Sequence, residues 1–117
     1  MKQEDKDLLL KDLCARLPYK VKAQIPDEYG GYTSVIESID IDGFVTDFEG
    51  VQMEVENIKP YLFPLESMTS DQRIEYSKTL LIFNVSQCSD WCNENHIDYR
   101  GLIKKGLAID ATGKNIY

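Results

Sequence analysis

Two cysteines and the only histidine of the chain follow one another at intervals of four residues, as Cys88, Cys92 and His96. On a continuous helix this spacing places the three side chains on one stripe, where two thiolates and an imidazole could bind Zn²⁺. Successive positions on that stripe lie about 6 Å apart, so they cannot all reach one ion at about 2.1–2.3 Å unless the helix unwinds. We predict instead that Cys88, Trp91 and Cys92 form a core-facing set on a helix.

A catalytic role for His96 would require a nucleophile or a carboxylate close to its imidazole. The available candidates are close only in sequence: Ser86, Ser89, Cys92 and Asp98. No nucleophile elbow or cysteine-protease signature surrounds them. We predict that His96 lies at a helix end, and we expect no catalytic residue and no cofactor. A small enzyme or a metal-dependent domain that uses Cys88, Cys92 and His96 is kept as an alternative.

Acidic residues dominate the stretch between Ala23 and Ile58, which contains no Lys, Arg or His. Its nine carboxylates are Asp27, Glu28, Glu37, Asp40, Asp42, Asp47, Glu49, Glu54 and Glu56. The formal net charge of the chain is −7, and all of it comes from this stretch. A field of one sign attracts cations and basic surfaces and repels phosphates and anionic lipid. We therefore expect neither direct nucleic-acid binding nor membrane binding.

We predict that part of this acidic stretch forms the solvent-facing side of a sheet and steers a basic protein partner. The predicted binding carboxylates are Asp40, Asp42, Asp47, Glu49, Glu54 and Glu56. Tyr29 and Tyr32, which flank two glycines, are candidate contact aromatics. A role in solubility alone would also explain an acidic face. The run Asp40-Ile41-Asp42-Gly43 resembles the start of a calcium loop but lacks the remaining ligands, so we interpret it as a tight turn.

The elements that must position these residues begin with a helix over residues 3–17. Its acids come early and Arg16 comes late, which suits the helix dipole. The expected apolar stripe of this helix is Leu9, Leu10, Leu13, Cys14 and Leu17. Residues 19–25 then alternate like a half-buried strand, with Val21, Ala23 and Ile25 on the buried face. Residues 26–31 are expected to form a turn.

Two tight-turn signals, Asp42-Gly43 and Glu49-Gly50, divide the middle of the chain into three alternating runs. If each dipeptide is a two-residue hairpin loop, one register satisfies both turns and the period of two. Its buried face carries Ile39, Ile41, Phe44, Thr46, Phe48, Val51, Met53 and Val55. Its solvent face carries Ser38, Asp40, Val45, Asp47, Gln52, Glu54 and Glu56. Glu37 does not fit this pattern, so we predict a β-bulge over 36–38 or an edge position.

A proline-containing segment and two helices are predicted to follow the meander. Residues 59–64 contain two prolines and are expected to form an extended crossover. Thr69 and Gln72 form a capping-box signature for a helix that runs to about residue 85. A second helix is expected over 86–95. The two helices could be continuous, because no Gly or Pro separates them.

The last part of the chain is predicted to contain little regular structure. One or two helical turns are expected over 99–105, and Gly106 should end them. A short strand is expected over 107–109. Together these elements predict a single α+β domain over residues 1–117, in which an N-terminal helix leads and an antiparallel meander of three to five strands packs against two or three C-terminal helices.

The composition is that of a folded domain, with 43% apolar and 28% charged residues. Three cysteines are an odd number in a chain of this size, which argues against a secreted disulfide framework. No segment has the apolar length of a signal peptide or of a membrane span. We therefore expect a cytoplasmic protein with reduced thiols.

Three segments resemble those of a group of short uncharacterised bacterial proteins: residues 6–18, residues 58–64 with Ser67-Met68-Thr69, and residues 98–108. Such proteins are similar to small accessory products of gut-bacterial mobile elements and prophages. The resemblance covers most of the chain and is loosest in the acidic stretch. It implies a cytoplasmic bacterial protein, and it brings no catalytic or ligand residues to this sequence.

The function that we predict from the sequence is a small non-enzymatic binding or accessory protein whose acidic sheet face engages a basic protein partner. A sharper form of this hypothesis makes the protein a nucleic-acid mimic, in which carboxylates imitate phosphates. A further alternative is a structural subunit of a homo-oligomer joined along an unpaired strand edge. The sequence leaves the oligomeric state open.

Overall fold

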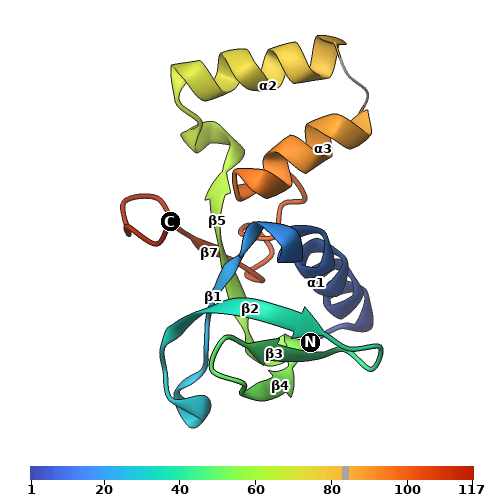
Figure 1. The fold of residues 1–117 in the computed structure, drawn as a ribbon, viewed down its shortest axis with the longest axis vertical. Coiled ribbons are helices and arrows are strands. Elements are labelled where there is room, and N and C mark those ends of the chain that lie inside the picture. Colours follow the sequence, from blue (N-terminus) through green and yellow to red (C-terminus); the bar gives the residue numbers. More distant parts are fainter. Residues whose placement is uncertain (83–84) are drawn as a thin grey trace.

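A computed structural model describes residues 1–82 and 85–117, and within these residues seven strands form one sheet (Figure 1). The strands are β1 (Lys22–Gln24), β2 (Thr33–Ile39), β3 (Phe44–Asp47), β4 (Gln52–Glu54), β5 (Lys59–Pro64), β6 (Ile97–Asp98) and β7 (Ile109–Asp110). The α-helices are α1 (Gln3–Arg16), α2 (Ser70–Ile82) and α3 (Val85–Glu94). This architecture confirms the α+β class and the leading helix.

The sheet is mixed, with the strand order β4-β3-β2-β1-β5-β6 and with β7 also paired to β5. Strands β1 to β4 pair in an antiparallel manner, whereas β6 and β7 run parallel to β5. The segment 59–64, predicted as a crossover, is thus the strand that joins the two halves of the sheet. Its two prolines are tolerated because β1, β7 and β6 each pair with only a short part of β5.

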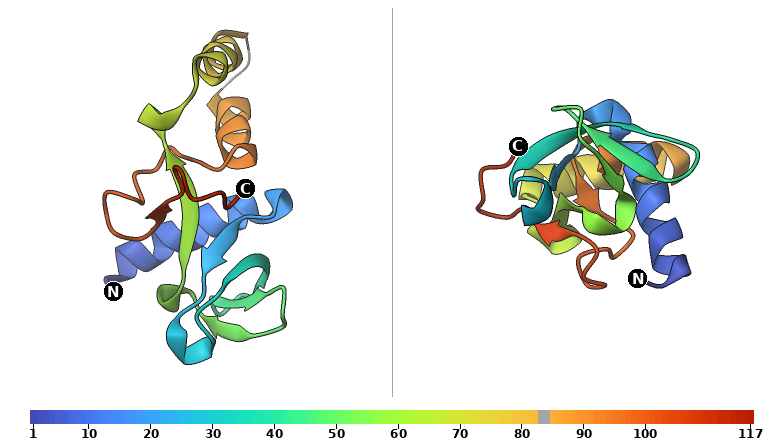
Figure 2. Two further views of the ribbon diagram at one scale, coloured as in Figure 1. Left: turned by 90° about the vertical axis from the view of Figure 1, so that its left-hand side faces the viewer. Right: turned by 90° about the horizontal axis from the view of Figure 1, so that it is seen from below.

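Helix α1 lies against the sheet (Figure 2). Its apolar residues enter the main core. Leu9 and Leu13 are fully buried there among strand residues such as Val21, Ala23 and Ile25. The predicted apolar stripe is correct for these two leucines but wrong for Cys14, which is exposed. The buried stripe of α1 instead includes a charged pair, Asp12 and Arg16.

Asp12 and Arg16 form a buried ion pair that connects α1 to the end of α3. Both side chains are 0% exposed, and Arg16 Nε lies 2.8 Å from Asp12 Oδ2. Arg16 Nη2 donates to the carbonyl of Ile97 at 2.7 Å, and Arg100 Nη1 donates to Asp12 Oδ1 at 3.0 Å. The ring of Tyr99 lies beside both guanidinium groups, 5.6 Å and 4.6 Å from their centres. The pair therefore ties α1 to β6 and to the loop that follows it.

The predicted register of the meander is wrong by one residue along β3. Val45 lies opposite Met53 and Ile39, so Val45 faces the core instead of solvent. Asp47 is also buried, whereas Phe44 points outward opposite Glu54. Strand β4 has the predicted orientation, with Met53 buried between exposed neighbours.

The cause of this inversion is that both hairpin loops contain three residues and not two. Gly43 N–H donates to the carbonyl of Asp40, and Asp40 N–H donates to the carbonyl of Phe44. Asp47, Gly50 and Val51 repeat this arrangement in the second loop. Each loop ends in a glycine with φ near +85°, as in a type I turn followed by a bulge. One extra residue in each loop turns β3 over and leaves β2 and β4 in place.

A β-bulge in β2 keeps the buried side chains of that strand on one face. Its register shifts between Ile36 and Ser38, and Glu37 is exposed. Ile36 is fully buried before the shift, and Ile39 packs against the same core after it. This confirms the bulge predicted from the misfit of Glu37. The bulge allows an acidic residue to enter a strand without entering the core.

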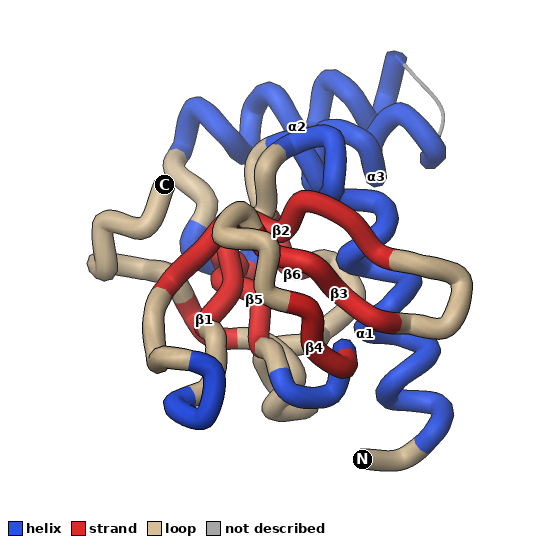
Figure 3. The backbone as a smooth tube through the Cα atoms, turned by 60° about the horizontal axis from the view of Figure 1, so that its bottom comes forward, coloured by secondary structure: helices blue, strands red, loops and turns tan. Residues whose placement is uncertain are grey.

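Helices α2 and α3 lie side by side beyond one end of the sheet (Figure 3). The capping box is confirmed, because Thr69 N–H donates to Gln72 Oε1 at 3.0 Å and Gln72 N–H donates to Thr69 Oγ1 at 3.2 Å. The rings of Tyr76 and Trp91 are 5.8 Å apart, so the two helices fold back on each other and do not form one rod. They share a second, smaller core with the end of β5.

The described helices include none that is both long and apolar enough to cross a lipid bilayer. The longest, α1, has 14 residues and carries charged side chains along its length. A helix that spans the hydrocarbon core needs about 20 mostly apolar residues.

We expect the replacement Arg16→Ala to lower the free energy of unfolding by about 3–5 kcal/mol, because it leaves the Asp12 carboxylate buried with a weakened set of donors. Urea unfolding monitored by the fluorescence of Trp91, the only tryptophan, would measure this change. Lys11→Ala on the exposed side of the same helix is the control and should change stability by less than about 0.5 kcal/mol. Equal effects of the two variants would contradict a stabilising role for the ion pair.

A three-residue loop and a two-residue loop predict opposite changes in stability when Glu49 is replaced by glycine. Gly50→Ala should destabilise the protein by about 1–2 kcal/mol, because alanine disfavours the positive φ of this position. An added Cβ would meet no other atom, so no steric clash contributes. Glu49→Gly should also destabilise, by about 0.5–1 kcal/mol, since Glu49 has a negative φ. A two-residue loop would require a positive φ at Glu49 and would gain stability from glycine. Thermal unfolding of Glu49→Gly distinguishes the two loops, whereas Gly50→Ala tests the positive φ that both loops require of Gly50.

Candidate functional site

The acidic meander, which we define as β2, β3, β4 and their two loops (residues 33–54), lies at the end of the molecule opposite α2 and α3 (Figure 1). Most carboxylates of the base-free stretch remain at the surface. Seven are exposed: Asp27, Glu28, Glu37, Asp40, Asp42, Glu49 and Glu54. Glu56 is half-buried and Asp47 is buried. Five of the six predicted binding carboxylates thus reach solvent at least in part.

The two loops of the acidic meander repeat one local design of aspartate, apolar residue, acid and glycine. The aspartate is structural: Asp40 Oδ1 accepts the N–H groups of Asp42 and Phe44, each at 2.9 Å. Asp47 Oδ1 accepts the N–H of Val51 at 2.9 Å in the second loop. The acid at the third position, Asp42 or Glu49, is exposed. Each loop therefore presents one free carboxylate to solvent.

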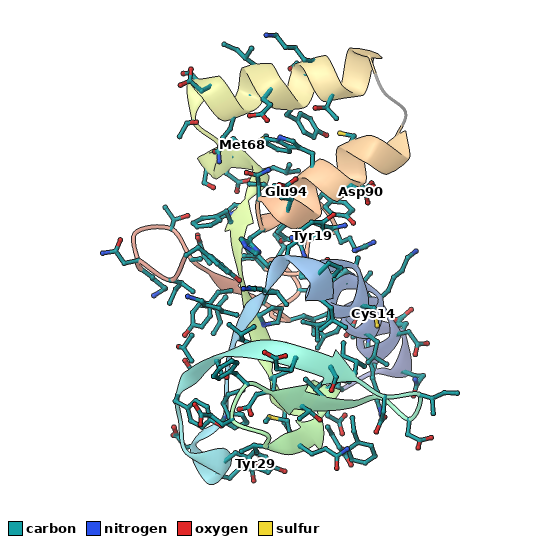
Figure 4. The ribbon with its side chains drawn as sticks, viewed as in Figure 1. Cys14, Tyr19, Tyr29, Met68, Asp90 and Glu94 are labelled. Atoms are coloured by element: carbon teal, nitrogen blue, oxygen red, sulfur yellow. The ribbon has the colours of Figure 1, made fainter. Side chains whose placement is uncertain are left out.

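Asp47 lies on the interior side of the acidic meander, which corrects its predicted position on the solvent face, and Tyr32, just before β2, is half-buried. Asp47 is 1% exposed, and its carboxylate accepts a hydrogen bond from the hydroxyl of Tyr32. This hydrogen bond is the main reason why the pKa of Tyr32 is raised to about 12. Tyr29 differs, since it is 37% exposed and lies at the tip of the meander end of the molecule (Figure 4). Tyr29 remains available for contact, whereas the Tyr32 hydroxyl is occupied.

Three large apolar side chains are exposed among these acids. Ile41 is 100% exposed, Phe48 is 70% exposed and Phe44 is 37% exposed. Ile41 and Phe48 directly follow the aspartate of each Asp-apolar-acid-Gly loop, and Phe44 lies on the outer face of β3. Sequence reasoning missed them because the two-residue loops placed all three on the buried face. The repeated Asp-apolar-acid-Gly pattern is the signal that could have revealed two of them.

The charge of the acidic meander is not balanced by neighbouring cations. Among the residues that the structure describes, both ion pairs involve Asp12, which lies outside this stretch. The exposed acids are therefore able to attract an external cation. Carboxylates without a partner inside the protein are able to pair with lysines and arginines of another surface.

Cys88, Cys92 and His96 do not form the stripe that a metal site would need. The predicted core-facing set is confirmed, because Cys88, Trp91 and Cys92 are all buried. Burial is the main cause that raises the pKa of the Cys92 thiol to about 11, so Cys92 stays protonated. Within the described part of the chain, no three His, Cys, Asp or Glu side chains are arranged to hold a metal ion.

His96 lies beyond the last turn of α3, with φ of +58°, and its ring leaves the helix face. The helix-end position is confirmed, but the imidazole stacks on the ring of Tyr117 at 3.7 Å between centroids. Burial, together with the nearby cations Arg16 and Lys22, lowers the pKa of His96 to about 4. The imidazole packs on Tyr117 and is not grouped with the two cysteines in an arrangement that could hold a metal ion, among the residues that the structure describes.

Comparison of the chain with protein-family models, with curated proteins and with solved structures gave no match. The resemblance to short bacterial proteins therefore stays a prediction from the sequence.

The packing of His96 predicts that its imidazole takes up a proton only at acidic pH. Its titration can be followed without overlap because the chain contains one histidine. By NMR, the imidazole should titrate with a midpoint near pH 4 instead of its ordinary 6.5. Because the unfolded chain takes up this proton at a higher pH, stability should fall as the pH decreases from about 6.5 toward 4. Tyr117→Ala, which removes the stacked ring, should move the midpoint back toward 6.5. A midpoint near 6.5 in the unaltered protein would contradict the stacked arrangement.

Proposed function

We propose that this protein is a small cytoplasmic binding protein without enzymatic activity, and that its acidic meander engages a basic surface of a partner protein. The observation that carries the proposal is the exposure of Ile41 and Phe48 at the tips of two loops that also present free acids. Apolar side chains supply binding energy when a partner covers them, and the surrounding carboxylates supply steering and orientation. This combination is typical of a protein-binding surface.

Solubility alone explains this surface less well. A surface selected only for solubility gains from charge but loses from exposed isoleucine and phenylalanine. Both loops nevertheless place such a residue at the second position, where a polar residue would fit the same backbone. The acids without internal partners and the exposed apolar tips are both explained if a partner covers them.

An affinity capture tests the proposal with two variants of equal charge. The first carries Asp42→Lys, Glu49→Lys and Glu54→Lys, all at exposed positions of the acidic meander. The control carries Glu66→Lys, Glu75→Lys and Asp90→Lys, which are also exposed. Asp90 lies on α3, far from Tyr29 and the meander (Figure 4). Each triple replacement changes the formal net charge from −7 to −1.

The wild type and the control should capture the same partner from a lysate of the source cells, and the meander variant should lose on the order of tenfold of the signal. Raising the salt concentration should weaken capture by the wild type, because exposed charges are screened. If duplex DNA displaces the partner, the nucleic-acid mimic is the form of the proposal that applies. Equal capture by both variants would overturn the proposal.

A further inference from the structure

A groove lies between the second loop of the acidic meander and the C-terminal segment. Its volume is about 510 Å³, and its floor is the solvent-facing side of β1 and β2, where Lys22 lies opposite Val35. Phe48 and Glu49 of the second loop line the groove, and so does Ile116 of the C-terminal segment. The groove therefore begins at the loop that carries the most exposed aromatic residue of the meander.

The wall formed by the C-terminal segment is held in place by Tyr117. The Tyr117 hydroxyl accepts the N–H of Lys22 at 2.9 Å and donates to the carbonyl of Tyr61 at 2.8 Å. The ring stacks on His96. Lys22 Nζ donates to the carbonyl of Ile116 at 2.8 Å and lies over the Tyr117 ring. The groove is thus preformed, which reduces the entropy that a ligand would lose in ordering it.

The groove contains one cation, Lys22, and one carboxylate, Glu49, which differ in the bonds that they already form within the protein. The ammonium group of Lys22 is already engaged by the C-terminal segment. Glu49 is exposed and forms no ion pair with any residue that the structure describes. Next to this carboxylate, Phe48, Val35 and Ile116 offer apolar surface. The groove thus combines apolar contact with the negative charge of Glu49, while Lys22 keeps its positive charge beside the C-terminal segment.

We propose that this groove binds a short extended segment of the basic partner, with an apolar side chain against Phe48, Val35 and Ile116 and an adjacent lysine or arginine paired with Glu49. This inference rests on the proposed function and names the partner feature that the acidic meander recognises. The cation is selected by the charge of Glu49 and by the base-free stretch around it. The apolar neighbour covers the phenyl ring that the free protein leaves in water.

The probe is the blocked peptide acetyl-Ala-Leu-Arg-Ala-amide, titrated into the full ¹⁵N-labelled chain and followed by NMR. The amide resonances of Thr33, Val35 and Glu49 should shift and saturate with a dissociation constant on the order of 1 mM. The peptide with Glu in place of Arg should cause no shifts there. Glu49→Gln should weaken binding by at least about threefold. Glu54→Gln, at an exposed acid outside the groove, is the matched control and should bind like the wild type.

Three outcomes would overturn the proposal that the groove binds a peptide. They are no shifts of amide resonances at peptide concentrations up to about 10 mM, shifts confined to other regions of the protein, or equal shifts with the Arg and Glu peptides. The affinity capture separates this failure from failure of the proposed function. If Phe48→Ser captures the partner as well as the wild type while the triple lysine variant does not, the acidic surface stands and the groove is not used. Because Phe48 is 70% exposed, its replacement should leave the fold intact.

Discussion

The buried ion pair of Asp12 and Arg16 constrains how the two halves of this protein meet. Moving two charges out of water costs several kcal/mol per ion unless nearly every donor and acceptor is satisfied. Here Arg100 and the carbonyls of Ile97 and Cys92 supply the missing partners. All of them come from residues about 80 positions away in the chain. The pair therefore tolerates only one placement of α1 against the end of α3 and the loop that follows it.

Once α1 is placed, the acidic meander is free to carry surface chemistry. The main core beneath it is filled by α1 and by the inward side chains of β1 to β4. Its loops satisfy their backbone N–H groups through Asp40 and Asp47, so they need no further support from the rest of the protein. A rigid loop that organises itself can expose Ile41 or Phe48 and an acid without losing its shape. Structural and surface roles are thus divided between neighbouring acids of one loop.

The same division of labour applies to the sulfur and imidazole groups. Cys92 belongs to the smaller core, Cys88 is buried one turn earlier on α3, and burial keeps Cys92 protonated. His96 is removed from their face because α3 ends before it, and its ring supports Tyr117 instead. Tyr117 in turn holds the wall of the groove beside Glu49. His96 therefore serves to pack the C-terminal segment.

Local sequence signals determined much of this structure. Some elements were predicted correctly because neighbouring residues alone decide them. Examples are the helix cap of Thr69 and Gln72, the strand alternation of Val21, Ala23 and Ile25, and the β-bulge at Glu37. The exposure of most carboxylates in the base-free acidic stretch was also predicted from the sequence. Only the tertiary structure decided the orientation of β3, since one extra loop residue reverses every side chain of a strand. It alone also revealed the partners of Arg16, because these come from segments distant in the chain.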